Sequence, residues 1–202
     1  MLEANNLIFS YDRGREPVLD RVNLRVEPGE RVGIFSPSGS GKTTLLKILS
    51  GYLVPEKGQI LVNGSPLPQR GFCPVQMVWQ HPERAVNPRL TMKKILAEGG
   101  PGNSRLETVF GIQEDWKRRY PGELSGGELQ RFCIVRALGE GTKYLLADEI
   151  TAMLDFITQA QIWRGLIEET EKRQIGMAVV SHSRELLDQV CTRIVTLEEL
   201  KN

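Results

Sequence analysis

Several features that would mark a secreted or membrane-spanning protein are scarce in this sequence. Its 202 residues include only three cysteines, Cys73, Cys133 and Cys191, which lie far apart in the chain. This usage indicates reduced thiols in a reducing compartment and argues against a metal cluster. The first residues contain no apolar run preceded by positive charge, so we expect no signal peptide. No continuous apolar stretch approaches about 18 residues, which predicts that nothing in the chain spans a membrane.

A charge excess of either sign is also lacking. Lys plus Arg total 26 and Asp plus Glu total 25, which gives a formal net charge of +1 at pH 7. Charge alone therefore argues neither for nor against a nucleic-acid partner. The chain instead has an ordinary soluble composition, with 40% hydrophobic and 25% charged residues. Its length suffices for one domain with its own core, and we expect a single domain over residues 1–202.

Short apolar strands alternate with helices over most of the chain. After an apolar stretch at residues 7–9, strands are predicted at residues 18–26, 32–35, 59–62, 75–79, 144–147, 177–180 and 193–197. Helices are predicted at residues 42–50, 158–172 and 184–190. Alternation of apolar strands with helices indicates an α/β fold with a parallel sheet.

The region from about residue 81 to residue 139 differs from the rest of the chain in its sequence pattern. Prolines and glycines separate short helical pieces there, such as residues 105–112. We therefore expect an inserted, mainly helical subdomain within a core formed by about residues 1–80 and 140–202.

Residues 36–43, SPSGSGKT, match the phosphate-loop pattern G-x-x-x-x-G-K-[ST] everywhere except at the first position, where glycine is replaced by Ser36. Small residues let backbone N–H groups converge on phosphate oxygens at a helix N-terminus, where the dipole favours negative charge. Lys42 is predicted to reach the β- and γ-phosphates, and the Thr43 hydroxyl to ligate Mg²⁺. The loop follows an apolar strand and opens an amphipathic helix, as this mechanism requires. The predicted ATP-binding residues are Ser36, Pro37, Ser38, Gly39, Ser40, Gly41, Lys42, Thr43 and Thr44.

Two adjacent carboxylates, Asp148 and Glu149, follow the apolar strand at residues 144–147. Ligands of a parallel sheet bind at the carboxyl ends of its strands. Asp148 can therefore hold Mg²⁺, and Glu149 can polarise water for in-line attack on a phosphate. Solvated acids at a strand end are the alternative, and the phosphate loop upstream argues against it.

A second glycine-rich helix start lies at residues 124–131, LSGGELQR. Ser125 is a good N-cap, and Gly126 and Gly127 leave backbone N–H groups accessible at the first turn. Taken alone, this stretch is equally compatible with an ordinary capped helix.

The order of these motifs is more specific than any one of them. The phosphate loop is followed by Gln80 at a strand end, LSGGE, an apolar strand ending in Asp-Glu, Leu154-Asp155, and His182 after another apolar strand. Over essentially its whole length the chain thus resembles the ATP-binding cassette (ABC) family, the ATPase subunits of ABC transporters. The resemblance implies a P-loop cassette with a parallel-sheet core, an antiparallel N-terminal β portion and an inserted helical subdomain.

The resemblance also implies roles for individual residues. Glu149 would act on water, His182 would hold the γ-phosphate, and Gln80 would join the catalytic set. Mg²⁺ would be held by Thr43, Gln80 and Asp148, and Tyr11 matches the aromatic residue that stacks on adenine, although a half-exposed strand tyrosine is the alternative. Four residues of the signature motif would serve the nucleotide of a partner cassette: Ser125, Gly126, Gly127 and Glu128.

Members of this family act as paired cassettes on membrane proteins. The resemblance implies a second cassette, either an identical copy or a sister subunit, together with transmembrane permease subunits and a solute-binding protein. It places the chain in the cytoplasm, peripheral on the inner face of the cell membrane, with no nucleic-acid partner. The stretches WQHPERAVNPRLTM and ADEITAMLDFITQAQI are similar to the dipeptide, oligopeptide and nickel import group, although the C-terminal extension common there is missing.

Three residues depart from the family pattern. The first loop position also accepts alanine in the family, so Ser36 meets a demand for smallness; positive φ there would cost about 1–3 kcal/mol of strain. Ile150 replaces the usual proline, which affects loop rigidity, and Met153 replaces a small residue, which alters dimer packing. None of these changes removes a group with a chemical role, so we expect a working ATPase.

Other functions remain as alternatives. One is a soluble ABC-type ATPase acting on DNA or ribosomes, although the chain has no coiled-coil arm, zinc module or tandem cassette. A P-loop kinase or GTPase is another, but it predicts neither LSGGE nor the late histidine. The third is an ATP-binding regulator that does not hydrolyse ATP.

Overall fold

Two β-sheets organise the computed structural model, which describes residues 1–12, 16–101 and 104–201. An antiparallel sheet has the strand order β2-β1-β4-β5 and is formed by β1 (Leu2–Phe9), β2 (Leu19–Val26), β4 (Lys57–Val62) and β5 (Ser65–Pro66). A parallel sheet has the order β6-β7-β8-β3-β9 and is formed by β3 (Arg31–Ile34), β6 (Val75–Val78), β7 (Tyr144–Asp148), β8 (Gly176–Val180) and β9 (Arg193–Val195).

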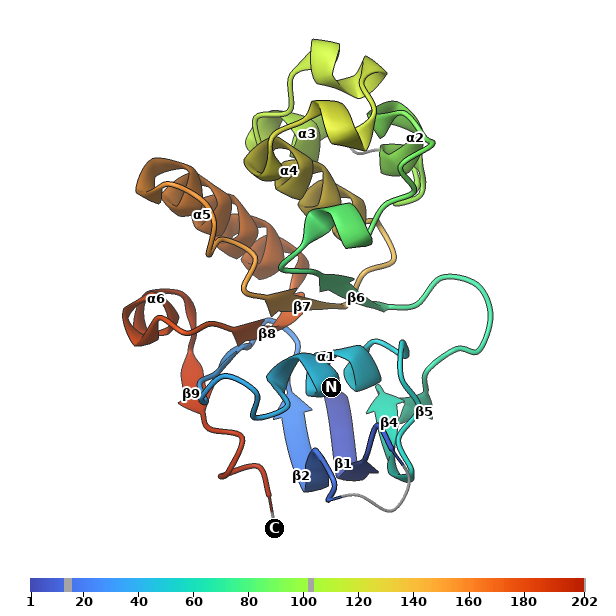
Figure 1. The fold of residues 1–202 in the computed structure, drawn as a ribbon, viewed down its shortest axis with the longest axis vertical. Coiled ribbons are helices and arrows are strands. Elements are labelled where there is room, and N and C mark those ends of the chain that lie inside the picture. The colour runs from blue at the N-terminus through green and yellow to red at the C-terminus, as the bar shows by residue number, and fades with distance from the viewer. Residues whose placement is uncertain (13–15, 102–103, 202) are drawn as a thin grey trace.

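Helices cover the parallel sheet on both sides. Helix α1 (Lys42–Leu49) lies between the two sheets (Figure 1). Between β6 and β7 the chain leaves the core and forms α2 (Met92–Ala97), α3 (Ser104–Val109) and α4 (Gly126–Ala137), with 3-10 turns at Pro82–Arg84, Glu114–Arg118 and Pro121–Glu123. These elements project as a separate helical layer, and α5 (Phe156–Arg173) and α6 (Arg184–Val190) follow in the core (Figure 1).

Alternate residues of the central strands enter two different cores. In β7, Leu145 and Ala147 pack with the helices α4 and α5, whereas Leu146 faces α1 and the antiparallel sheet. A strand buried on both faces has no polar side for water, which explains the continuous apolar runs of β7 and β8. Both cores meet at the sheet whose edge carries the motifs.

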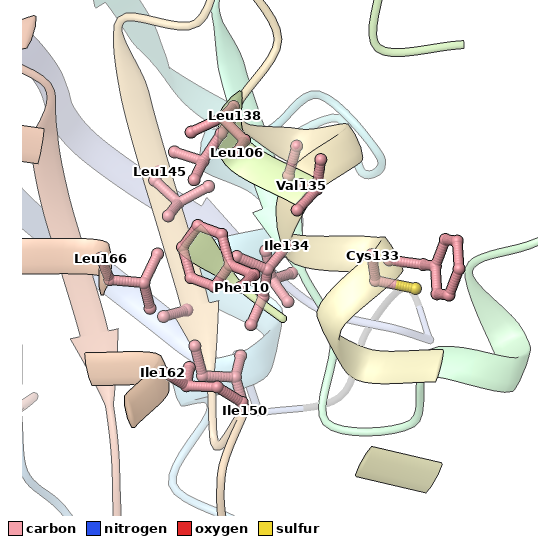
Figure 2. Packing of buried hydrophobic residues seen from close by; sticks show 14 of the residues in the cluster. Leu106, Phe110, Cys133, Ile134, Val135, Leu138, Leu145, Ile150, Ile162 and Leu166 are labelled. Atoms are coloured by element: carbon pink, nitrogen blue, oxygen red, sulfur yellow. The ribbon is translucent and has the colours of Figure 1, made fainter. Parts of the chain in front are cut away.

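Phe110 packs between the inserted helices and the core. It is the residue directly after α3, and its fully buried ring lies near Ile134 of α4 and near Ile162 and Leu166 of α5 (Figure 2). A Cβ atom added at Gly165 of α5 would lie 3.2 Å from the Phe110 ring, so the glycine makes room for it. A buried phenylalanine contributes about 1.5–3 kcal/mol through transfer from water.

The predicted fold class is confirmed: a parallel-sheet core, an antiparallel N-terminal sheet and inserted helices. The first strand begins at Leu2, five residues earlier than the apolar stretch at residues 7–9 indicated. Asn6 explains the difference, because its φ of 52° interrupts the strand alternation between Ala4 and Leu7. No helix within the described residues is long and apolar enough to cross a membrane.

Several predicted boundaries differ from the observed ones by one or two residues, and two of these differences have a local cause. Helix α5 starts at Phe156 and not at residue 158, because the Asp155 carboxylate accepts hydrogen bonds of 3.0 Å from the N–H groups of Ile157 and Thr158 and caps the helix earlier. The last strand, β9, ends at Val195 and not at residue 197, since Leu197 enters a turn.

Candidate nucleotide-binding site

The predicted nucleotide residues meet at the carboxyl edge of the parallel sheet. The phosphate loop leaves β3, Asp148 ends β7, Glu149 follows it, and His182 comes two residues after β8. Most of them line a cavity of about 320 Å³, whereas Ser36, Pro37, Ser40 and Asp148 do not belong to its lining. Its lining residues are Tyr11, Val18, Ser38, Gly39, Gly41, Lys42, Thr43, Thr44, Gln80, Glu149 and His182.

The phosphate loop owes its path to two glycines. Gly39 and Gly41 have φ values of 78° and 105°, in a region that side chains rarely adopt. A Cβ atom at Gly41 would also lie 3.0 Å from a Val18 methyl group. Gly41 is the N-cap of α1 and offers no side-chain cap, so the first N–H groups of the helix are open to an anion. The Ser40 hydroxyl is buried without a hydrogen-bond partner among the described residues.

Lys42 folds across the loop that precedes it. Its ammonium donates hydrogen bonds to the carbonyl oxygens of Ser36 at 2.5 Å and Pro37 at 2.8 Å. Burial lowers the pKa of Lys42, and the nearby charges of Glu149 and Asp148 oppose that shift. The ammonium thus lies at the loop with hydrogen bonds that a phosphate can replace.

Thr43 and Asp148 supply a pair of oxygen atoms suited to a hard cation. The Thr43 hydroxyl donates a 2.9 Å hydrogen bond to Asp148, which is 3% exposed. Burial raises the pKa of Asp148, and the Thr43 hydrogen bond opposes the shift. The described residues contain no group of three or more His, Cys, Asp or Glu side chains able to cage a metal. Mg²⁺ is usually bound by one or two carboxylates together with substrate phosphates, and this donor set fits that arrangement.

Glu149 and His182 are in direct contact in the lining of the cavity. The distance between Glu149 Oε1 and His182 Nε2 is 2.5 Å, and His182 Nε2 also lies 3.4 Å from the Ser38 hydroxyl. Glu149 adopts a φ of 49°, which is unusual for a side chain of this size and occurs at functional sites. A carboxylate that can accept a proton and an imidazole that can donate one therefore lie next to the loop.

The signature motif opens onto a different cavity. Ser125 caps α4 as predicted: its hydroxyl accepts from the Glu128 N–H at 3.3 Å, and the Glu128 carboxylate accepts from the Ser125 N–H at 2.8 Å. This second cavity measures about 560 Å³, and it shares only Gln80 and Glu149 with the first. Residues 125–128 and Asp155 line it, but within the described chain none of them lines the phosphate-loop cavity.

Tyr11 lies at the rim of the phosphate-loop cavity. Its ring is 61% exposed and packs edge-on against Phe9, with the ring centroids 5.1 Å apart. Its hydroxyl lies 3.0 Å from the Thr44 hydroxyl, a contact that the sequence did not predict. The exposed ring face remains accessible to a planar ligand.

Ser36 carries no backbone strain. It does not belong to the described residues with positive φ, so the cost considered for replacing the usual glycine does not arise. Its hydroxyl accepts a 2.8 Å hydrogen bond from the N–H of Leu197. Sequence reasoning missed this contact, because the two residues are 161 positions apart.

The fold and the site together define a P-loop ATPase with an inserted helical signature region. A family model described as ABC transporter matches residues 19–152. The chain belongs to the ABC transporter family and is an ATP-binding, ATP-hydrolysing subunit of that family. The ABC resemblance predicted from the sequence is confirmed.

Individual relatives align over nearly the whole chain. The Staphylococcus aureus (strain bovine RF122 / ET3-1) nickel import system ATP-binding protein NikE is 31% identical over 98% of this chain and 87% of its own length. The methionine import ATP-binding protein MetN 2 of Pseudomonas syringae pv. tomato (strain ATCC BAA-871 / DC3000) is 32% identical over 98% of this chain but only 64% of its own length. Among solved structures, the dimeric post-hydrolysis state of the cassette MJ0796 bound to ADP and Pi matches with a TM-score of 0.83 and 26% identity, over 97% of this chain and 94% of that one.

Proposed function

We propose that this chain powers an ABC importer of a small solute of the nickel or oligopeptide class. Proteins whose names record nickel and methionine import support the direction of transport. The observation that carries the chemistry is the convergence of Lys42, Thr43, Glu149 and His182 on one cavity at the sheet edge. Asp148 lies beside them, bonded to Thr43.

ATP binding is assigned to the phosphate loop and its rim. The open N–H groups at the start of α1 and the Lys42 ammonium neutralise the phosphates, and Lys42 exchanges its carbonyl partners for phosphate oxygens. Residues 36–44 shape the cradle, and the exposed ring of Tyr11 stacks on adenine.

Hydrolysis is assigned to Glu149 as general base. Its carboxylate lines the cavity in contact with His182; once released, it orients and deprotonates the attacking water, while His182 holds the γ-phosphate. Thr43, Asp148 and Gln80 would hold Mg²⁺, which would supply positive charge beside the phosphates. Release of Glu149 from its contact with His182 is the rearrangement that frees both groups for substrate.

The signature motif is assigned to the ATP of a second cassette. Ser125, Gly126, Gly127 and Glu128 line a cavity other than that of the phosphate loop, so their helix terminus is available to another chain. The cassette MJ0796, with which this fold compares, was solved as a dimer. The partner is an identical copy or a sister subunit, and closure on ATP followed by opening after hydrolysis drives the membrane partner.

Permease subunits hold the pair on the inner face of the cell membrane, and a solute-binding protein delivers the solute.

Two measurements test this function. Purified protein should release phosphate from ATP only when Mg²⁺ is present, and absence of any turnover would favour a regulator. Cells lacking the gene should accumulate less radioactive nickel or labelled dipeptide, and complementation with Glu149→Gln should not restore uptake. Unchanged uptake of both solutes would remove the substrate class while leaving the ATPase intact.

A further inference from the structure

Ser36 connects the phosphate loop to a segment near residue 200. The backbone ladder between β3 and β9 ends with the Phe35 N–H donating to the Val195 carbonyl at 2.9 Å. The loop then turns away from the sheet, and the next hydrogen bond between the two segments is made by a side chain: the Ser36 hydroxyl accepts from the Leu197 N–H at 2.8 Å. Ser36 and Leu197 are 6% and 2% exposed, so water does not compete for this bond.

The 196–201 segment is itself firmly held. Thr196 and Glu199 exchange two hydrogen bonds, from the Thr196 N–H to the Glu199 carboxylate at 2.7 Å and from the Glu199 N–H to the Thr196 hydroxyl at 3.2 Å. The Leu200 carbonyl accepts from the Asn23 N–H of β2 at 2.7 Å. Leu197 and Leu200 are buried in the core shared with α1 and the antiparallel sheet. The segment is therefore a fixed support and not a loose strand end.

The other side of Ser36 holds Lys42. The Ser36 carbonyl accepts a 2.5 Å hydrogen bond from the Lys42 ammonium, the group assigned to the ATP phosphates. Before ATP binds, one residue thus links the support to the phosphate-binding lysine, through its hydroxyl on one side and its carbonyl on the other; the hydroxyl bond remains when Lys42 exchanges the carbonyl for a phosphate oxygen. Glycine, the residue that the pattern G-x-x-x-x-G-K-[ST] has at this position, provides the carbonyl but no hydroxyl.

We propose that Ser36 is a positioning residue through which the 196–201 segment pre-organises the phosphate loop for ATP. The proposal rests on the ATP site described above. Without the hydroxyl, the buried Leu197 N–H loses its acceptor. The loop also loses its only side-chain hydrogen bond to the 196–201 segment among the described contacts. A loop that must be ordered on binding weakens affinity, because part of the binding free energy is then spent on ordering it.

A matched pair of serine variants separates positioning from general stability. Ser50 is also buried, and its hydroxyl donates to the Leu46 carbonyl at 2.7 Å at the far end of α1, without contact to the 196–201 segment among the described hydrogen bonds. Ser36→Ala and Ser50→Ala should each lower the melting temperature by about 2–6 °C. Only Ser36→Ala should weaken ATP affinity, by about three- to tenfold, with KM for ATP rising equally and kcat changing less than twofold. Ser36→Gly should behave like Ser36→Ala, since both lack the hydroxyl.

Amide hydrogen exchange reports on the link without any need for turnover. The Leu197 amide should be protected in the wild-type protein, and ATP without Mg²⁺ should slow its exchange further, since coupling between two sites is reciprocal. Ser36→Ala should remove both effects. The wild-type measurement also keeps the proposal testable if the variant does not fold.

Two results would overturn the proposal. One is wild-type ATP affinity in a folded Ser36→Ala protein, which would make the hydrogen bond purely structural. The other is a Leu197 exchange rate that does not respond to ATP in a wild-type protein that binds ATP. Failure of the ATP site itself is distinguishable, because the wild-type protein would then bind no ATP although Leu197 protection would still depend on Ser36.

Discussion

The chain contains two glycine-rich helix starts, and they differ in how their N–H groups are satisfied. Gly41, the N-cap of α1, provides no side-chain cap, while Ser125, the N-cap of α4, forms a reciprocal capping box with Glu128. The first lies at a sheet edge that also presents Lys42 and Asp148. The second lies on the inserted helices, outside the cavity that the first forms.

The comparison shows that a small-residue helix start becomes an anion site through its surroundings. At α1 the sheet brings cationic and acidic groups to the open helix terminus. One chain alone therefore forms the part of the site that binds the ATP phosphates. At α4 the cap already satisfies part of the terminus, and Arg131, the cation that lines its cavity among the described residues, donates a hydrogen bond to the Phe110 carbonyl. The α4 terminus is therefore suited to contribute to a nucleotide that is bound elsewhere.

The largest expected effect concerns the acid beside the α1 site. Glu149→Gln keeps the shape of the side chain but removes its basicity, so ATP should still bind while kcat falls by about 10²–10⁴-fold. Steady-state phosphate release and binding of fluorescent ATP measure the two quantities separately. Turnover at the wild-type rate would take Glu149 out of the catalytic role.

A smaller effect is expected at the lysine that completes the α1 site. Lys42→Ala removes a charge-assisted contact with phosphate, which is worth about 1.5–3 kcal/mol and corresponds to roughly 10–100-fold in the ATP dissociation constant. Circular dichroism should show an unchanged fold. Wild-type affinity in a folded variant would contradict the assignment of this loop. Lys57→Ala in β4 is a control, because Lys57 is exposed and does not line the cavity, so its loss should leave affinity unchanged.

The smallest effects sharpen the contrast between the two glycine-rich starts. Gly41→Ala meets both a φ of 105° and a Val18 methyl group, and should cost about 1–3 kcal/mol of stability together with ATP affinity. An added Cβ at Gly126 meets no atom within 4 Å, so Gly126→Ala should leave stability and ATP affinity of the single chain unchanged. Chemical denaturation and ATP titration of both variants check this, and equal effects at the two positions would remove the distinction.

Much of the fold follows from local patterns in the sequence. The apolar runs of β7 and β8 predict strands buried on both faces, and Ser125 as an N-cap predicts the start of α4. The motif order placed the nucleotide residues at the sheet edge, since strand carboxyl ends in a parallel sheet share that edge.

Contacts between distant residues could not be read from the sequence. The Ser36 bond to Leu197 and the Tyr11 contact with Thr44 join segments 161 and 33 positions apart, and no periodicity records such pairs. The left-handed conformation of Glu149 is equally invisible, because glycine and asparagine are the residues that normally indicate it. Strained or functional positions are where local rules fail.

The central claim is that the two helix starts act on the same ATP only when they come from two chains. Glu149→Gln blocks hydrolysis, so addition of Mg²⁺ and ATP should convert the purified variant from monomer to dimer in size-exclusion chromatography with light scattering. Ser125→Arg introduced into the same protein should abolish the dimer while ATP affinity stays within about twofold of the parent. A Ser125→Arg protein that still dimerises with ATP, or that loses ATP binding as a monomer, would contradict the claim.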